Sequence, residues 1–189
     1  MACVVEQTGK QVYTTPLRID LDFHHLLKKS FATKLVSAII LKDTVQAASV
    51  DHRLKPQVLL GSRKNTQHYS DYWSLPIGHV ESGETNLQAI IRELKEELSI
   101  EVLEATELFV KTNSENNILH QVFWVRKWRG ELVNAEPECC HQIKWFEYNR
   151  LPEPITPITV EIVTDFVNSK LFKQTLIVPI ESLIFYLHF

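Results

Sequence analysis

Three glutamates, Glu93, Glu96 and Glu97, lie close enough together in the sequence to form a metal site. Each residue of an α-helix turns the chain by about 100°, so Glu97 lies about 40° to one side of Glu93 and Glu96 about 60° to the other. Such crowding of negative charge is unfavourable unless a cation neutralises it. Carboxylate oxygens suit Mg²⁺ or Mn²⁺, and protein-bound Mg²⁺ is usually shared between a few carboxylates and substrate phosphates. The alternative is an ordinary solvated helix face.

The residues around these glutamates predict an amphipathic helix with an organised start. Apolar side chains share a separate arc centred about 115° from the first glutamate; they are Leu87, Ile90, Ile91, Leu94 and Leu98. Thr85 is a candidate N-cap, and Gln88 follows three residues later, as in a capping box. Before the cap, Gly78 and Gly83 bracket a loop whose backbone can approach a ligand closely. The strand-like residues 72–76 lead into this loop, so the segment favours a built site over random surface.

Residues 78–100 resemble the Nudix box, G-x5-E-x7-R-E-U-x-E-E-x-G-U, in which U is a bulky aliphatic residue. Eight of its nine specified positions match, namely Gly78, Glu84, Arg92, Glu93, Leu94, Glu96, Glu97 and Ile100. The one departure is Ser99, which stands where the pattern has its second glycine. That position follows the helix, where a left-handed residue is common. Serine there should cost about 1 kcal/mol of stability or shift the cap slightly, and it leaves every ligand position intact.

The resemblance extends beyond the box and covers roughly residues 34–170. Residues 58–64 resemble the strand that precedes the box in MutT-type members of the family. Arg63 takes the place of an arginine at the end of that strand, and His68 falls where these members carry a nucleotide-contacting histidine. Residues 128–146, followed by Leu151 and Pro152, resemble a run found in many nucleotide-cleaving Nudix proteins.

Two departures concern substrate selectivity. Ile77 stands where MutT-type proteins usually have a second glycine. No asparagine follows Leu151 and Pro152 to match the one that reads an oxidised guanine. The sequence therefore gives no support for selectivity toward 8-oxo-dGTP.

The resemblance implies a role for each matched residue. The expected metal ligands are Glu93, Glu96, Glu97, the backbone carbonyl of Ile77, and a glutamate from a later loop, for which we expect Glu138 in preference to Glu136. We expect Glu93 to act as the base, and Arg92 to orient the carboxylates with Glu84 as its partner. The expected substrate-binding residues are Arg63, His68, Gly78 and His79, with Lys64 as a further positive charge near the pocket. Tyr72 or Trp73 would either stack on a base or belong to the core.

The fold class implied is α/β, a Nudix α/β/α sandwich with a mixed β-sheet. The activity implied is that of a Mg²⁺-dependent pyrophosphohydrolase, with Mn²⁺ as a possible substitute, and the first-choice reaction converts a (d)NTP to a (d)NMP and pyrophosphate. Alternatives of the same class are nucleotide sugars, dinucleoside polyphosphates and non-nucleotide diphosphates. The alternative of another class is a nucleotide-sensing domain without catalysis, and the intact set of Glu93, Glu96 and Glu97 argues against it.

Length and composition fit one compact enzyme, and the resemblance implies a small-molecule nucleotide or other diphosphate as its substrate. The chain has 189 residues, 44% hydrophobic and 23% charged, with a net charge of −3. This acidic balance argues against a nucleic-acid partner. Three cysteines make no disulfide framework and favour a reducing, cytoplasmic setting. Zinc binding by Cys139, Cys140 and His141 is not expected, because neighbouring strand residues point to opposite faces and no second ligand pair is present.

Neither end of the chain predicts a membrane segment. The first thirty residues lack the apolar region of a secretory signal. Residues 182–189 are apolar but far shorter than the ~20 residues that span a bilayer. They predict a closing strand or a segment packed on the core, with a dimer contact as the alternative, so we expect a monomer or a homodimer.

Three parts are expected along the chain: an N-terminal extension (1–33), the Nudix domain (34–170) and an apolar C-terminal tail (171–189). Residues 35–41 read as a buried strand with residues 58–63 as its hairpin partner, and the polar segment 42–56 between them is long for a hairpin loop. Further strands are expected at 106–112, 119–127 and 142–147, and a helix at 158–170.

Overall fold

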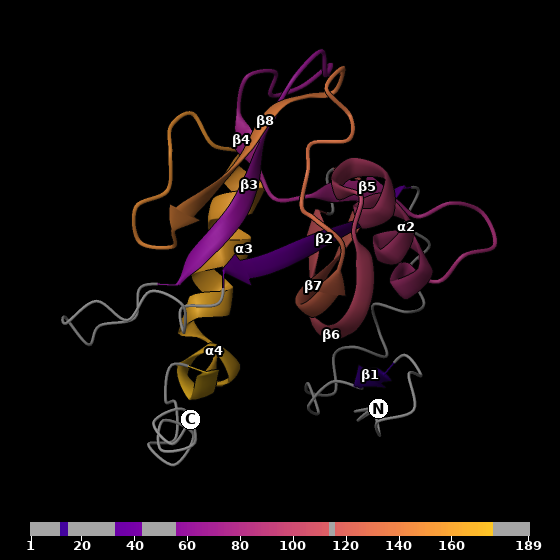
Figure 1. Cartoon of the computed structure of the whole chain (residues 1–189), viewed down its shortest axis with the longest axis vertical. Helices are drawn as coiled ribbons and strands as arrows, with labels where there is room; N and C mark the ends of the chain where they lie inside the picture. The colour runs from indigo at the N-terminus through magenta and orange to yellow at the C-terminus, as the bar shows by residue number, and fades with distance from the viewer. Residues whose placement is uncertain (1–11, 15–32, 43–55, 114–115, 176–189) are drawn as a thin grey trace.

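The computed structural model of the chain describes residues 12–14, 33–42, 56–113 and 116–175 (Figure 1). Most of the expected N-terminal extension, the polar segment from residue 43 to residue 55, and the tail from residue 176 onward lie outside the described residues. Within the described part of the chain, no helix is both long and apolar enough to cross a membrane.

The elements follow the expected order with adjusted ends. The strands are β1 (Val12–Thr14), β2 (Thr33–Lys42), β3 (Gln57–Arg63), β4 (Trp73–Ser74), β5 (Ile77–His79), β6 (Glu101–Asn113), β7 (Ile118–Arg129) and β8 (Cys140–Glu147). The helices are α2 (Asn86–Leu98), α3 (Pro157–Asn168) and α4 (Lys170–Thr175). β6 begins five residues earlier than predicted, because the chain enters the sheet directly after α2. The short elements β1, β5 and α4 were not predicted, since a strand or helix of so few residues leaves no periodic pattern to recognise.

The strands form a mixed sheet, as predicted, with the order β1-β6-β7-β2-β3-β4. β2 runs parallel to β7 on one side and antiparallel to β3 on the other. The expected partnership of β2 and β3 is confirmed but short, since only Leu41 and Lys42 of β2 take part. The first half of β2 pairs instead with β5, and β8 pairs with β3. β2 thus joins the two halves of the sheet, and the candidate site lies where β3 and β5 meet beside it.

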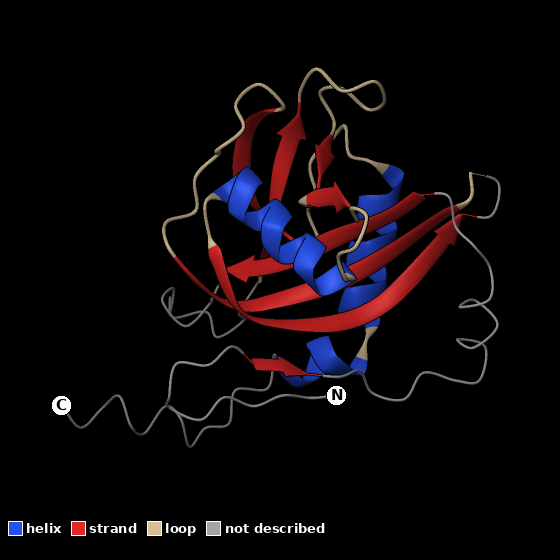
Figure 2. Ribbon diagram, turned by 90° about the vertical axis from the view of Figure 1, so that its right-hand side faces the viewer, coloured by secondary structure: helices blue, strands red, loops and turns tan. Residues whose placement is uncertain are grey.

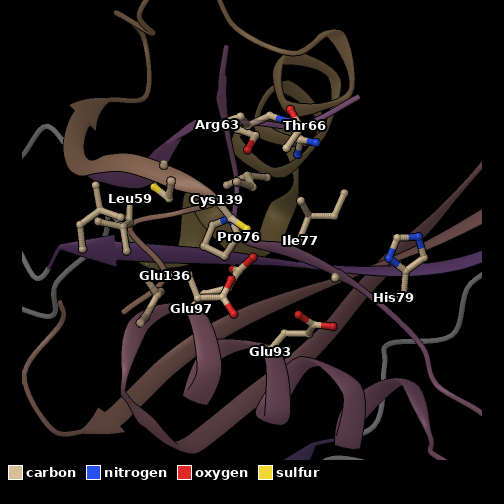
Figure 3. A pocket seen from close by; sticks show the side chains of 17 residues that line it. Leu59, Arg63, Thr66, Pro76, Ile77, His79, Glu93, Glu97, Glu136 and Cys139 are labelled. Atoms are coloured by element: carbon tan, nitrogen blue, oxygen red, sulfur yellow. The ribbon is translucent and has the colours of Figure 1, made fainter. Parts of the chain in front are cut away.

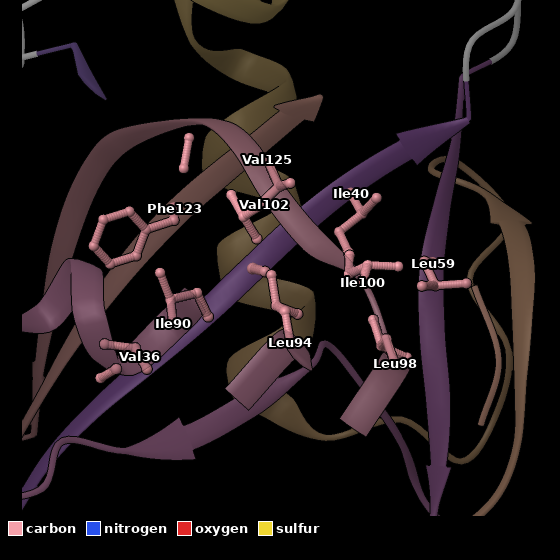
Figure 4. Close-up of a cluster of buried hydrophobic side chains, with 13 residues drawn as sticks. Val36, Ile40, Leu59, Ile90, Leu94, Leu98, Ile100, Val102, Phe123 and Val125 are labelled. Atoms are coloured by element: carbon pink, nitrogen blue, oxygen red, sulfur yellow. The ribbon is translucent and has the colours of Figure 1, made fainter. Parts of the chain in front are cut away.

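The sheet is buried on both faces, which gives the expected α/β/α arrangement (Figure 2). Successive side chains of a strand point to opposite faces. One face of β2, β3 and β7 packs on α2 through Val36, Ala38, Ile40, Leu59, Phe123 and Val125, most of them labelled in Figure 4. The other face packs on α3 and α4 through Ile39, Val58, Leu60, Val122 and Trp124. This two-sided burial holds β3, β5 and α2 in fixed positions around the site.

Helix α2 forms as its sequence predicts. Thr85 caps the first turn, and Gln88 completes a reciprocal capping box. The buried residues are Ala89, Ile90, Leu94 and Leu98, while Leu87 and Ile91 pack at the edge of the same core. Ser99 ends the helix in the left-handed conformation, with φ of 58°. The predicted left-handed residue after this helix is therefore present, and here it is a serine.

The C-terminal helices cover the second face of the sheet. α3 ends at Asn168, two residues earlier than predicted, and α4 follows almost at once. Phe172 of α4 is buried against Tyr148 and Phe166, with ring centroids 5.3 and 5.2 Å apart. The packed core therefore reaches at least as far as Phe172.

Candidate active site

A cavity of about 280 Å³ lies between α2, the ends of β3 and β5, and the loop that leads into β8 (Figure 3). Such a volume is at the small end of the range of ligand pockets. Its lining combines aliphatic and thiol-bearing side chains with carboxylates. Its lining residues are Leu59, Gly61, Arg63, Thr66, Ser74, Leu75, Pro76, Ile77, Gly78, His79, Glu93, Glu97, Leu98, Glu136, Cys139, Cys140 and Ile143.

Two of the three helix glutamates line this cavity. Glu93 and Glu97 project from α2 toward β5 in Figure 3. The Glu96 side chain is 49% exposed and lies outside the lining. Gly78 allows the close approach of Glu93, because a Cβ atom added at Gly78 would overlap the Glu93 carboxylate. The glycine at the start of the box is thus required by space and not by an unusual φ, since only Gly83 and Gly130 have positive φ among the described glycines.

Glu97 has the most perturbed carboxylate of the site. Burial raises its pKa to about 8, and the negative charges of Glu93 and Glu136 add to that shift. The nearby Arg63 and a hydrogen bond with the Ile77 backbone lower its pKa, but by less. A buried carboxylate surrounded by like charges binds a proton or a cation to restore its balance. Glu97 is therefore the residue of the site that gains most from a bound cation.

Arg92 binds three carboxylates at once. Its guanidinium donates to Glu84 at 2.7 and 3.2 Å, to Glu93 at 2.8 Å and to Glu96 at 3.0 Å. It also donates to the His79 carbonyl at 2.9 Å. The hydrogen bond from Arg92 lowers the pKa of Glu84 and keeps this carboxylate ionised. The predicted contact between Arg92 and Glu84 is present, and through it the helix is tied to the loop and to β5.

The later-loop glutamate at the cavity is Glu136. Glu138 is exposed and does not line the cavity, so the structure places Glu136 where the sequence had favoured Glu138. Burial is the largest cause that raises the pKa of Glu136, and the charges of Glu138, Glu93 and Glu96 raise it further. The two glutamates are two residues apart in a tight turn, and the direction of that turn decides which of them faces the cavity. No local sequence signal distinguishes them.

The expected substrate-binding residues divide into two groups. Arg63, Gly78 and His79 line the cavity, and the Arg63 Nε is buried without a hydrogen-bond partner among the described residues. His68 is exposed and outside the lining, in the loop after β3. The Lys64 ammonium donates to the Pro137 carbonyl at 2.8 Å and so serves to join two loops.

Neither aromatic residue before the box lines the cavity. Trp73 packs edge-on against Phe146, with ring centroids 4.8 Å apart, at the edge of the core. Tyr72 lines a separate surface hollow with Glu153, Pro154 and Ile155. The core alternative is thus the one realised for Trp73.

Sequence reasoning missed the neutral part of the cavity wall. Thr66, Ser74, Cys139 and Cys140 line the cavity, but none belongs to a recognisable motif. Cys140 reaches it because Arg63 and Cys140 are paired across β3 and β8. A predicted pairing of these two strands was the one signal that would have indicated Cys140.

The donor chemistry of the site fits a hard divalent cation. Glu93, Glu97 and Glu136 offer carboxylate oxygens at one cavity wall, and such oxygens are the ligands that Mg²⁺ prefers. Arg92 engages Glu93 and Glu96. No group of three His, Cys, Asp or Glu side chains within the described residues is already gathered as a metal centre.

Comparison with known proteins gives the same family. The NUDIX domain family model matches residues 43–166. A protein from Proteus vulgaris named 8-oxo-dGTP diphosphatase is 32% identical over 84 residues, which are 43% of this chain and 75% of that protein. Among solved structures, a MutT NUDIX hydrolase from Burkholderia pseudomallei is 27% identical with a TM-score of 0.58, over 70% of this chain and 95% of that one.

A NUDIX hydrolase from Nitrosomonas europaea shares the fold, with a TM-score of 0.57 at 15% identity over 76% of this chain and 74% of that one. The resemblance seen in the box is thus extended to residues 43–166 by the family model and is accompanied by a shared fold in the solved structures. Because the NUDIX model covers more than half of the chain and agrees with the fold and with the relatives, the chain belongs to the Nudix family and is a MutT-like pyrophosphohydrolase.

Proposed function

We propose that the chain hydrolyses a nucleoside triphosphate to the monophosphate and pyrophosphate with Mg²⁺, for which Mn²⁺ substitutes. The observation that carries this proposal is the buried Glu97 carboxylate beside Glu93 and Glu136, in a cavity that also contains Arg63. Hydrolysis requires water to attack phosphorus while negative charge builds on the phosphate oxygens. A site that concentrates carboxylates can hold the cations that neutralise this charge.

The residues present support a division of roles. Glu93, Glu96, Glu97, Glu136 and the Ile77 carbonyl would hold the metal, which when bound lowers the pKa of water and neutralises phosphate charge. Glu93 would accept the proton of the attacking water, since it lies at the cavity wall with its position set by Arg92. Arg92, held in turn by Glu84, keeps Glu93 and Glu96 oriented.

Arg63 and His79, which both line the cavity, would bind the substrate phosphates. Arg63 has an unused buried donor, and its charge is felt by Glu97. His68 is assigned no direct contact, since it lies outside the lining. The two adjacent free cysteines support a reducing compartment such as the cytoplasm as the place of action.

The relative named 8-oxo-dGTP diphosphatase makes 8-oxo-dGTP and dGTP the first substrates to compare. In this chain no asparagine follows Leu151 and Pro152 to read the oxidised guanine. We therefore expect kcat/KM for the two nucleotides to differ by less than about a hundredfold, or ~2.7 kcal/mol at the transition state. A larger preference would show that another residue reads the oxidised base.

The test of the function is a panel of nucleoside triphosphates, nucleotide sugars and dinucleoside polyphosphates with Mg²⁺, scored by the phosphate product released. Hydrolysis of a triphosphate to pyrophosphate should stop in EDTA and return with Mg²⁺ or Mn²⁺. Glu97→Gln keeps the side-chain shape and should lower kcat about a hundredfold or more with the fold intact. The matched control is Glu101→Gln, an exposed carboxylate just beyond the helix, which should keep full activity. If Glu97→Gln retained more than about half of the rate, the nucleotide-sensing alternative would replace this proposal.

A further inference from the structure

The turn that carries Glu136, residues 134–140, is fixed by hydrogen bonds within itself and by one to the end of α2. The Asn134 side-chain amide donates to the Cys140 carbonyl at 2.8 Å and so closes the turn at its base. The Ala135 backbone N–H donates to the Glu97 carbonyl at 3.0 Å, which joins the turn to the end of α2. Within the turn, the Cys139 and Cys140 N–H groups donate to the Glu136 carbonyl at 3.0 and 2.9 Å.

The loop after β3 holds the outer side of the same turn. Lys64 donates through its ammonium to the Pro137 carbonyl at 2.8 Å and through its backbone N–H to the Cys139 carbonyl at 2.7 Å. The Asn65 side-chain amide donates to the Glu138 carbonyl at 3.0 Å. Side chains from two different segments thus bind main-chain carbonyls of a single turn, and the carboxylate of Glu136 itself is not used as an anchor.

Such anchoring is needed because Glu136 is placed among like charges. Burial raises the pKa of Glu136 most, and the charges of Glu138, Glu93 and Glu96 further disfavour its ionised form. Repulsion among these carboxylates opposes the approach of the turn to α2, and the hydrogen bonds to the main chain of the turn counteract it. If the Glu136 carboxylate is to stay free to bind a cation, other groups of the turn must hold it in place.

Asn134 is the anchor whose chemistry is hardest to explain by stability alone. Its Nδ2 makes the bond to Cys140, but its Oδ1 is buried without a hydrogen-bond partner among the described residues. An apolar side chain of similar size would remove this unpartnered atom, which favours stability, but would also take the donor from the Cys140 carbonyl, which opposes it, so the two effects on stability partly offset each other. What the apolar side chain would lack is the bond that closes the turn.

We propose that Asn134 is a positioning residue that holds Glu136 at the wall of the cavity near Glu93 and Glu97. This inference rests on the proposed role of Glu136 as the later-loop ligand. Asn134 acts through Glu136 and touches neither the substrate nor the reacting atoms.

The test is a double-mutant cycle with Asn134→Leu and Glu136→Gln, measured as kcat and KM on a triphosphate substrate. Asn134→Leu should lower kcat about tenfold, since a displacement of about 1 Å in an active site can cost a hundredfold. It should leave Tm within about 4 °C of the parent. In the Glu136→Gln background the same change should have no further effect on kcat, because the group it positions is already gone. Asn168→Leu, the same substitution at the exposed end of α3, is the matched control and should be neutral.

A second readout uses the metal-free protein and does not depend on activity. In Asn134→Leu, amide hydrogen exchange at Cys139 and Cys140 should be about tenfold faster, because the turn that protects these amides opens more often. The Asn168→Leu control should exchange at the parent rate.

The outcomes separate the inference from the proposal on which it rests. If Glu136→Gln lowers kcat but Asn134→Leu leaves kcat and amide exchange unchanged, or lowers kcat equally in both backgrounds, Asn134 does not position Glu136. If Glu136→Gln itself keeps full activity, Glu136 is not the later-loop ligand and the inference falls with that role. Loss of activity in Glu97→Gln would still support the hydrolase.

Discussion

Replacing Glu97 by glutamine should stabilise the metal-free protein at alkaline pH while it abolishes catalysis. Glu97 is buried, and burial together with the charges of Glu93 and Glu136 raises its pKa to about 8 from the ordinary value of 4.5. Between these two values the unfolded chain has released its proton while the folded chain still holds it. Stability from this group is therefore fully present below pH 4.5 and is lost as the pH rises toward 8.

The magnitude follows from the size of the shift. Each pKa unit corresponds to about 1.4 kcal/mol, so a shift from 4.5 to about 8 corresponds to a loss of up to about 5 kcal/mol between these pH values. For a chain of this length, 1 kcal/mol changes Tm by about 2–4 °C, which predicts a fall of roughly 10–20 °C. Glutamine does not titrate, so Glu97→Gln should remove most of this fall.

The assay is thermal unfolding in EDTA at pH 5.5, 7 and 8.5, for the parent chain, Glu97→Gln and the surface control Glu101→Gln. The parent and the control should lose stability as the pH rises, and Glu97→Gln should not. Added Mg²⁺ should raise Tm of the parent most at pH 8.5, because metal binding requires the ionised carboxylate. If the parent and Glu97→Gln showed the same dependence on pH in EDTA, Glu97 would not be the buried titrating group of this site.

Three further changes test other parts of the structure. Ser99→Gly should raise stability by about 1 kcal/mol, because Ser99 has φ of 58° and glycine adopts this left-handed conformation without strain. Tm should rise by about 2–4 °C and kcat should stay nearly unchanged. A large change in kcat would mean that the helix cap positions the carboxylates. Gly78→Ala should lower kcat about tenfold or more with Tm little changed, because the new Cβ displaces Glu93; full activity would contradict the close approach. Burial lowers the pKa of His120 from 6.5 to about 4, so the parent should lose up to about 3 kcal/mol as the pH falls from 6.5 to 4. Urea unfolding at pH 4.5 and 7 should show this loss in the parent and little of it in His120→Gln.

The helix and its charged face were determined by the sequence itself. The capping box at Thr85, the apolar arc through Leu94 and the cluster of glutamates are set by spacings of one to four residues. Such short spacings fix which side chains share a helix face whatever the rest of the chain does. The contact of Arg92 with Glu96 belongs to this class, since the two residues lie one helical turn apart. The mixed sheet was predicted from the family resemblance, and the buried strands supported it through their apolar runs.

The part of the cavity lining that comes from β8 and the turn before it was decided only by the tertiary structure. Glu136 and Cys140 reach the site because β8 pairs with β3, which is far away in the sequence, and because the turn before β8 is anchored to α2. The direction of a turn depends on these distant bonds, so no local pattern could rank Glu136 above Glu138 or keep His68 out of the cavity. The raised pKa of Glu97 has the same origin, since burial is its largest cause. Burial and the approach of like charges arise when distant segments pack together, whereas the sequence alone specifies only which residues are available to be buried.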